Sequence, residues 1–349
     1  MKTKVGLSLF LVFGLMTSQL WAEEYKNMVF VAGDKSLAEW ILPDEPPYPA
    51  GNKPTPARVE LGKMLYFDPR ISGDGNMSCA TCHSPLFGWS DGLATAKGFK
   101  SQVLGRASHS IINTGFNHLQ MWDGRKKSLE EQAVGPMEAN VEMNTDFDKM
   151  FALLKSLSGY VNAFEAAYPG KGINKDTVAK AIASYERTII SNTSPFDAWV
   201  KGDNMALTKQ QVEGFKLFVN PEKGNCAVCH SAPNFVDDGF HNIGLKSFGI
   251  DKPDMGRHAQ RPLNLMKGAF KTPTLRDVAL SYPYFHDGSE KTLRGVVDHY
   301  SDGGVVKANL SPNMKKLSLT DNEKKKIVVF LESLTSPVKP FTLPILPHK

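Results

Sequence analysis

The sequence predicts a mainly α-helical protein built from two similar modules in tandem. Three observations predict this fold class. Apolar residues recur at helical spacing in several segments of the 349-residue chain. No segment shows a convincing alternation of the kind that builds a strand ladder. A helical segment followed by Cys-x-x-Cys-His occurs twice, near residues 80 and 230, and a chain of this length holds about two domains.

The two Cys-x-x-Cys-His segments are typical of c-type haem attachment. Each thiol adds to a haem vinyl group, and the histidine becomes the proximal iron ligand. Half of a zinc site or a redox-active cysteine pair are the alternatives. However, the two copies use all four cysteines, and a four-cysteine zinc site needs no histidine after each pair. We therefore predict two covalently bound haem c groups, attached to Cys79, Cys82, Cys226 and Cys229 and ligated by His83 and His230.

The N-terminus has the pattern of a secretory signal peptide. Lys2 and Lys4 precede an apolar run over residues 5–16, and cleavage is expected after Ala22. An uncleaved anchor is the alternative, although the run is short for a membrane span. No other segment is long and apolar enough to span a membrane, so we expect no membrane span after cleavage. Covalent haem attachment occurs outside the cytoplasm, so export agrees with the two haem motifs and predicts a periplasmic protein. Because the two motifs use all four cysteines, we expect no structural disulfide.

The composition and charge of the chain indicate which classes of partner to expect. The hydrophobic share of 41% suits globular cores, and the net charge of +5 is small. The chain has no basic run of the kind that binds nucleic acid, so no nucleic-acid partner is expected.

The first module is expected over residues 58–194, after an extended, proline-rich arm over 23–57. Apolar spacing predicts helices over 57–67, 145–157 and 175–190, and Ser128 with Glu131 predicts a helix start over 128–133. Residues 88–105 are expected to form an irregular loop. Ser194-Pro195 interrupts the chain, so we place the domain boundary there.

The second module is expected over residues 195–336, followed by an extended, proline-rich tail over 337–349. Helices are predicted over 208–218 and 292–300, and the capping box from Thr320 to Glu323 starts a helix that runs to Leu334. Together with the haem motifs, this pattern predicts two cytochrome-c-like haem domains in tandem, with extended N- and C-terminal arms.

Further motifs resemble one protein family. They are residues 121–125 (MWDGR), 129–133 (LEEQA), 135–136 (GP), 141–143 (VEM) and 282–288 (YPYFHDG), the last followed by Thr292-Leu293. In this order they resemble the bacterial dihaem cytochrome c peroxidase and MauG family. The resemblance runs from about Leu61 to Leu334.

The resemblance implies roles for individual residues. In this family the N-terminal haem reacts with peroxide and the C-terminal haem relays electrons. His83 would then ligate the peroxidatic iron, and Trp122 would lie between the haems. Gln132, Pro136 and Glu142 would form the distal pocket, with Glu142 as the acid–base group. A surface position for Glu142 and a purely structural core role for Trp122 are the alternatives.

One departure concerns the peroxidatic iron. Many of the peroxidases carry a histidine in the loop after the first motif, and it blocks the iron until the second haem is reduced. Phe99 stands at that position, whereas His109 and His118 lie nearer Trp122. We therefore expect an open iron that needs no reductive activation.

A second departure concerns the other iron. The peroxidases use a distal methionine and MauG uses a tyrosine, and Tyr300 stands at that position, with Met255, Met266 and Met314 elsewhere. A phenolate favours oxidised iron, whereas a thioether raises the potential. The alternative is a structural tyrosine, with methionine or water on the iron.

A calcium ion between the haems is left open. The carbonyl ligands used by the family match Ser281 and Pro283, but Ala107 replaces the family's asparagine ligand. Calcium prefers several oxygen ligands, and one is missing here.

These features place the chain nearer the MauG-like, tyrosine-ligated branch. We expect hydrogen peroxide to react at the N-terminal haem, and the oxidising equivalents to pass through Trp122 and the second haem to aromatic residues of a protein partner. Gly224 stands where MauG has its exit tryptophan, so that exit route does not transfer. The alternatives are a peroxidase that takes electrons from a small c-type cytochrome, and a plain dihaem electron carrier.

Overall fold

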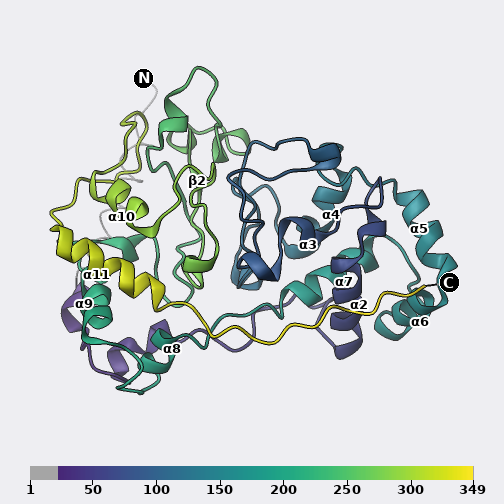
Figure 1. Cartoon of the computed structure of the whole chain (residues 1–349), viewed down its shortest axis with the longest axis horizontal. Helices are drawn as coiled ribbons and strands as arrows, with labels where there is room; N and C mark the ends of the chain where they lie inside the picture. Colours follow the sequence, from purple (N-terminus) through teal and green to yellow (C-terminus); the bar gives the residue numbers. More distant parts are fainter. Residues whose placement is uncertain (1–22, 349) are drawn as a thin grey trace, which may run out of the picture.

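The computed structural model describes residues 23–348, so the predicted signal peptide lies outside the described residues. The chain is mostly helical and forms two lobes that lie side by side (Figure 1). Each lobe has its own hydrophobic core. None of the described helices is long and apolar enough to cross a membrane.

The first lobe is built around two crossed helices. Its helices are α2 (Pro56–Phe67), α3 (Cys79–Cys82), α4 (Leu129–Glu138), α5 (Phe147–Ser156), α6 (Ser158–Ala167) and α7 (Lys175–Glu186). Helix α2 packs on α7 through Gly62, where any side chain would collide with the carbonyl of Ala181. Leu61, Leu65 and Ile182 are fully buried at this crossing.

The second lobe repeats this arrangement. Its helices are α8 (Pro195–Val200), α9 (Lys209–Val219), α10 (Leu293–Ser301) and α11 (Asp321–Glu332). Helix α9 packs on α11 through Gly214, which abuts the carbonyl of Lys326 and the side chain of Phe330. A helix with a glycine at its crossing thus precedes the Cys-x-x-Cys-His segment in each lobe.

The remaining elements are short. Strands β1 (Phe240–His241) and β2 (Phe270–Lys271) form one antiparallel pair, with Phe240 opposite Lys271. The 3₁₀ helices are η1 (Lys35–Trp40), η2 (Pro69–Ile71), η3 (Pro85–Phe87), η4 (Phe99–Ser101), η5 (Thr114–Phe116), η6 (Cys226–Val228), η7 (Lys246–Gly249), η8 (Arg257–Ala259), η9 (Asn264–Met266) and η10 (Val278–Leu280). Long connections between these elements carry most of the site.

Most predicted helices are confirmed, with ends that shift by a few residues. The capping box of Thr320 and Glu323 starts α11, and the Ser128 hydroxyl accepts the backbone N–H of Glu131 at the start of α4. The helix predicted over 175–190 ends at Glu186.

Besides the single turn α3, helices α6 and α8 were not predicted. Helix α6 follows α5 after only Leu157. Helix α8 begins at the Ser194-Pro195 pair that was expected to interrupt the chain. Proline fits the first helical turn because its missing N–H has no helical partner there, and Ser194 caps the helix together with Asp197.

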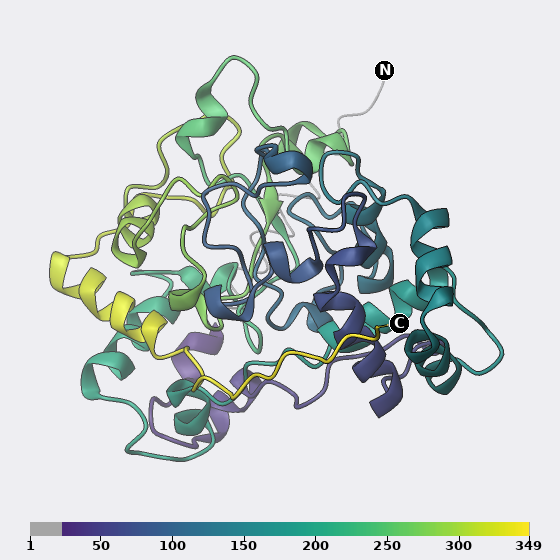
Figure 2. The same cartoon turned by 45° about the vertical axis from the view of Figure 1, so that its right-hand side comes forward.

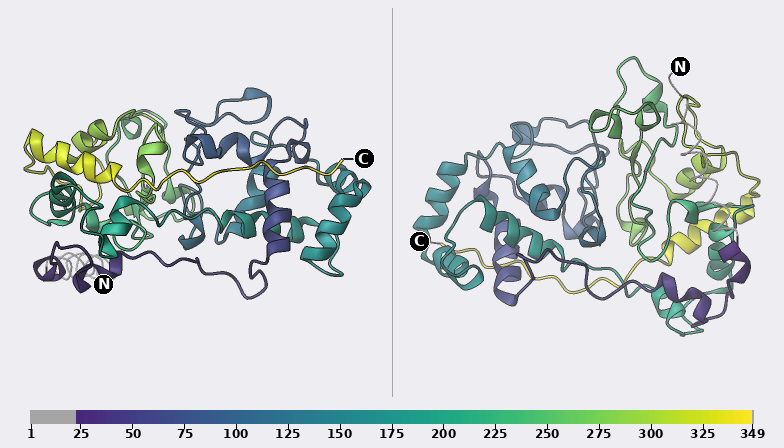
Figure 3. Two further views of the ribbon diagram at one scale, coloured as in Figure 1. Left: turned by 60° about the horizontal axis from the view of Figure 1, so that its bottom comes forward. Right: turned by 180° about the vertical axis from the view of Figure 1, so that it is seen from behind.

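The two ends of the chain cross between the lobes. The arm predicted to be extended over 23–57 instead forms η1, whose Leu37 and Trp40 are completely buried in the second core. The tail after residue 336 also runs from the second lobe to the first lobe (Figures 2 and 3). There Phe341 packs on Phe67 and Trp89.

Candidate functional site

A cavity of about 680 Å³ lies between the lobes and is lined by both Cys-x-x-Cys-His segments. The predicted site residues that line it are Cys79, Cys82, His83, Trp122, Gln132, Pro136, Glu142, Cys226, Cys229, His230, Ser281, Pro283 and Tyr300. The fold therefore brings together residues that are more than 200 positions apart in the sequence.

The two motif histidines are held in the same way. Nδ1 of His83 lies 2.8 Å from the carbonyl oxygen of His109, and Nδ1 of His230 lies 3.0 Å from that of Phe235. A carbonyl only accepts, so each Nδ1 carries the proton and each Nε2 keeps its lone pair. Burial lowers the pKa of both imidazoles, which keeps them neutral. Both rings are thus prepared to bind a metal through Nε2.

The four cysteines have no disulfide partners. Burial raises the pKa of Cys82 to about 11 and that of Cys226 to about 12, so these thiols stay protonated. Neutral buried thiols beside the cavity, together with two histidines that offer Nε2, fit two covalently attached haems.

A second group of metal-ligand side chains surrounds Cys229. Asp237 and His241 lie close to its sulfur, and the His241 Nε2 to Asp237 Oδ2 distance is 2.7 Å. Burial alone would lower the pKa of His241, but hydrogen bonds to Asp237 and Cys229 raise it to about 10. An imidazolium paired with a carboxylate has no lone pair for a metal, so this group is an ion pair beside the cavity.

Helix α4 and the turn after it supply the predicted distal residues. Gln132 and Pro136 are one helical turn apart and therefore share a face, and both line the cavity. Glu142 follows in a turn, and its backbone N–H donates to the carbonyl of Ala139. Burial raises the pKa of Glu142, and Arg125 and Lys126 partly offset this effect. The cavity thus has a carboxyl group suited to taking up and returning a proton.

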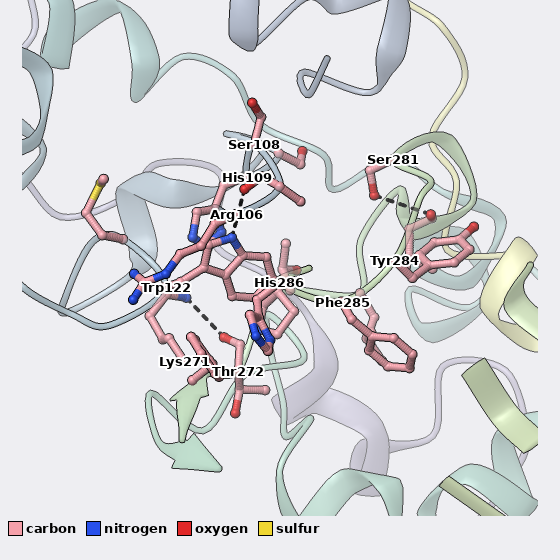
Figure 4. Close-up of a pocket in the computed structure, with 18 of the residues that line it drawn as sticks. Arg106, Ser108, His109, Trp122, Lys271, Thr272, Ser281, Tyr284, Phe285 and His286 are labelled. Carbon is pink, nitrogen blue, oxygen red and sulfur yellow. Dashed lines mark hydrogen bonds between the residues drawn. The ribbon is translucent and has the colours of Figure 1, made fainter. Parts of the chain in front are cut away.

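Trp122 is held from both lobes. Its indole N–H donates to the carbonyl of Ala107 at 2.9 Å, and its ring stacks on His109 with centroids 3.9 Å apart (Figure 4). From the other lobe, the N–H of Lys271 in β2 donates to the Trp122 carbonyl. Because the carbonyl of His109 also accepts from His83, contacts run from His83 through His109 to Trp122.

Tyr300 lies on α10 and faces the second motif. Burial raises the pKa of its phenol strongly, and the nearby Cys229 and Cys226 thiols add to the effect. Met314, which the sequence places away from the expected ligand position, also lines the cavity. Both side chains can therefore be considered as ligands on the second-lobe side.

Comparisons with known proteins agree with this geometry. The family profile described as di-haem cytochrome c peroxidase matches residues 56–205. The chain is 42% identical to the methylamine utilization protein MauG of Methylorubrum extorquens over 311 residues, which covers 89% of this chain and 87% of the relative. The chain belongs to the di-haem cytochrome c peroxidase family. It is accordingly a dihaem peroxidase-like oxidoreductase.

Other members of the family are nearly as similar. The cytochrome c551 peroxidase of Nitrosomonas europaea is 36% identical and covers 83% of both chains. The crystal structure of a MauG-like protein associated with microbial copper homeostasis aligns with a TM-score of 0.80 and 28% identity, over 85% of this chain and 94% of that one. MauG-type and peroxidase-type members therefore both resemble this chain.

Several lining residues were missed from the sequence. Lys271 is only 4% exposed, its ammonium donates to the carbonyl of Thr272, and burial lowers its pKa to about 8. His286 stacks on Phe270, and burial lowers its pKa to about 4. Glu186 is buried with Oε2 unbonded in the described chain, and burial raises its pKa to about 8. His286 belongs to a quoted motif, but the other two carry no local sequence signal.

Phe99 and Ala107, the two residues that replace family ligands, both lie in backbone hydrogen bonds near the cavity. Phe99 does not line the cavity, and its N–H donates to the carbonyl of Val141, next to Glu142. The N–H of Ala107 donates to the carbonyl of His286, while its own carbonyl accepts the Trp122 indole. The methyl group of Ala107 offers no oxygen to a cation.

Proposed function

We propose that this protein is a periplasmic, MauG-like oxidase. It reacts with hydrogen peroxide on the first-lobe side of the cavity and passes the oxidising equivalents through Trp122 to the second-lobe side. Aromatic side chains of a protein partner are then oxidised. The observation that carries this proposal is Tyr300, whose phenol lines the cavity beside Cys226 and Cys229.

Residues of the first lobe handle the protons. Bound haem supplies the iron at which peroxide is reduced. Glu142 takes a proton from one peroxide oxygen and returns it to the departing oxygen. Its raised pKa suits both roles, because a group that titrates nearer the working pH can accept and donate. Phe99 does not line the cavity, which agrees with an iron that is open on the Glu142 side.

Trp122 links the two sides. Its indole N–H is bonded to a backbone carbonyl, which does not accept a full proton, so the loss of an electron does not require the loss of that proton. Stacked contact with His109 gives the oxidised ring a polarisable neighbour. Each peroxide takes two electrons and two protons to give two waters, and the partner supplies both.

Three further assignments belong to this proposal. Domain boundaries at 58–194 and 195–336 agree with the positions of the two cores, although residues 28–40 pack with the second. Export directed by a signal peptide that is cleaved after residue 22 agrees with the two c-type haem motifs. A calcium ion held by the carbonyls of Ser281 and Pro283 remains an alternative, to be tested by metal analysis of the purified protein.

The test is spectroscopic. The ferric holoprotein is recorded by EPR and optical spectroscopy before and after one equivalent of hydrogen peroxide. We expect one high-spin and one low-spin haem, a rapid reaction without prior reduction, and a long-lived oxidised state with near-infrared absorption. Addition of a partner should discharge that state and leave an oxidised aromatic residue detectable by mass spectrometry. Two low-spin haems that ignore peroxide until reduced contradict the proposal.

A second candidate is a cytochrome c peroxidase, and one observation favours it. Met314 lines the same cavity as Tyr300, and a thioether on the second iron would raise its potential and suit it to receive electrons. Rapid steady-state peroxide reduction with a reduced small c-type cytochrome would support this candidate.

A further inference from the structure

Two tyrosines lead from the cavity to the surface of the second lobe. Tyr284 lines the cavity and packs against the second core, and Figure 4 shows it beside Ser281 and apart from Trp122. Tyr282 does not line the cavity and is 53% exposed. Tyr282 and Tyr284 are two positions apart, so their Cα atoms are separated by at most about 7 Å.

The backbone fixes this arrangement. The N–H of Tyr284 donates to the carbonyl of Glu290 at 2.7 Å. Leu280, just before the pair, touches Gly88 of the first lobe so closely that a side chain at Gly88 would collide with it. Tyr282 therefore emerges where the two lobes meet.

We propose that Tyr282 is the residue through which oxidising equivalents leave this protein, with Tyr284 as the step between it and the cavity. This inference rests on the proposed function and identifies the residue at which the oxidising equivalents leave the protein. Gly224 also lines the cavity, but it has no side chain to oxidise. A phenol is readily oxidised when its proton can leave, and the exposed Tyr282 can release that proton to water.

The electrons and protons balance through the partner. Oxidised Tyr282 has lost one electron and its phenolic proton, and it regains both from an aromatic side chain of the docked protein. Two such transfers supply the two electrons and two protons that one hydrogen peroxide needs to become two waters. Tyr282 is unchanged after the cycle, so the partner alone is oxidised.

The experiment treats the full-length holoprotein with hydrogen peroxide and a nitroso spin trap, without any partner. Wild type, Tyr282→Phe and Tyr284→Phe are compared with Tyr48→Phe. Tyr48 is a matched control because its phenol is bonded to Glu45 and does not line the cavity. Peptide mass spectrometry locates the trap adduct, and optical spectroscopy follows the formation and decay of the oxidised state.

We expect an adduct at Tyr282 in wild type and in Tyr48→Phe. Tyr282→Phe should lose the adduct and keep the oxidised state longer, with an unchanged rate of formation. Tyr284→Phe should lower the adduct yield at Tyr282. An adduct elsewhere, with normal decay in Tyr282→Phe, overturns the exit assignment while the proposed function stands. No optical change in wild type means that the proposed function itself fails, and the exit assignment with it.

Discussion

Glu142 shows how burial prepares a single side chain for proton transfer. We predict that Glu142→Gln slows the reaction with hydrogen peroxide by about 10²- to 10⁴-fold, because the amide neither takes nor returns a proton. In wild type the rate should fall as the pH drops through the raised pKa of this carboxyl, at a higher pH than for an ordinary glutamate. Stopped-flow measurement of the haem absorption checks both effects.

The matched control is Glu138→Gln, at the C-terminal end of α4 and four residues before Glu142. Glu138 is exposed and paired with Lys175 outside the cavity, so its variant should react at the wild-type rate. Equal slowing in both variants would mean that the charge of this segment matters rather than proton transfer by Glu142.

Tyr300 and Met314 give the second prediction at this scale. If the phenol ligates the iron, Tyr300→Met should raise the midpoint potential of one haem, on the order of 100 mV, within the ~0.8 V that axial ligands span. Near-infrared absorption after peroxide should also be lost. Met314→Leu should change neither property, and redox titration followed optically measures both variants. The reverse pattern, with Met314→Leu lowering the potential, would assign the ligand to Met314.

The sequence predicted the residues that react better than those that support them. The cysteines, His83 and His230 belong to a local pattern, so their role follows from spacing alone. His109 and Lys271 could not be found in this way. Their positions depend on loops that meet only when the lobes pack, and a loop conformation leaves no periodic signal in the sequence.

At the scale of elements, amphipathic spacing predicted the helices that form the two cores but not the contacts that join them. Helix α8 was missed because a proline was taken as a break, although it occupies the first helical turn. Helix α6 was missed because only Leu157 separates it from α5. In each lobe the choice of crossing partner depends on one glycine, Gly62 or Gly214, which local propensity does not indicate.

Arg276 joins several elements of the second lobe. Its buried guanidinium pairs with Asp197 of α8 at 2.8 Å and donates to the carbonyls of Pro233 and Trp40. We predict that Arg276→Leu lowers the free energy of unfolding by about 3–5 kcal/mol, because the buried Asp197 carboxylate loses its partner. Denaturant titration of the holoprotein measures this change. The control Lys149→Ala removes an exposed ion pair and should leave the denaturation midpoint unchanged.

At the scale of the whole molecule, the lobes are joined by the crossing ends of the chain. Phe341 packs on Phe67, and the Arg70 guanidinium donates to the carbonyl of Pro347 at 2.9 Å. We predict that removal of residues 337–349 lowers the melting temperature and splits one thermal transition into two, as scanning calorimetry would detect. Val338→Ala, at an exposed position of the same tail, should have no effect. A single unchanged transition in the truncated protein would show that the cavity contacts alone join the lobes.

The crossing of the two ends also sets the order in which the protein can mature. Residues 28–40, among the first to be made, pack in a core whose last helix ends at Glu332. The first lobe in turn receives Phe341 and Pro347 from the far end of the chain. The second core is therefore incomplete until α11 has been made, whereas the first core is built from residues that all precede position 190. Cys226 and Cys229 are therefore made before the helix that closes the core of their own lobe, so the second pair of cysteines is enclosed later than the first.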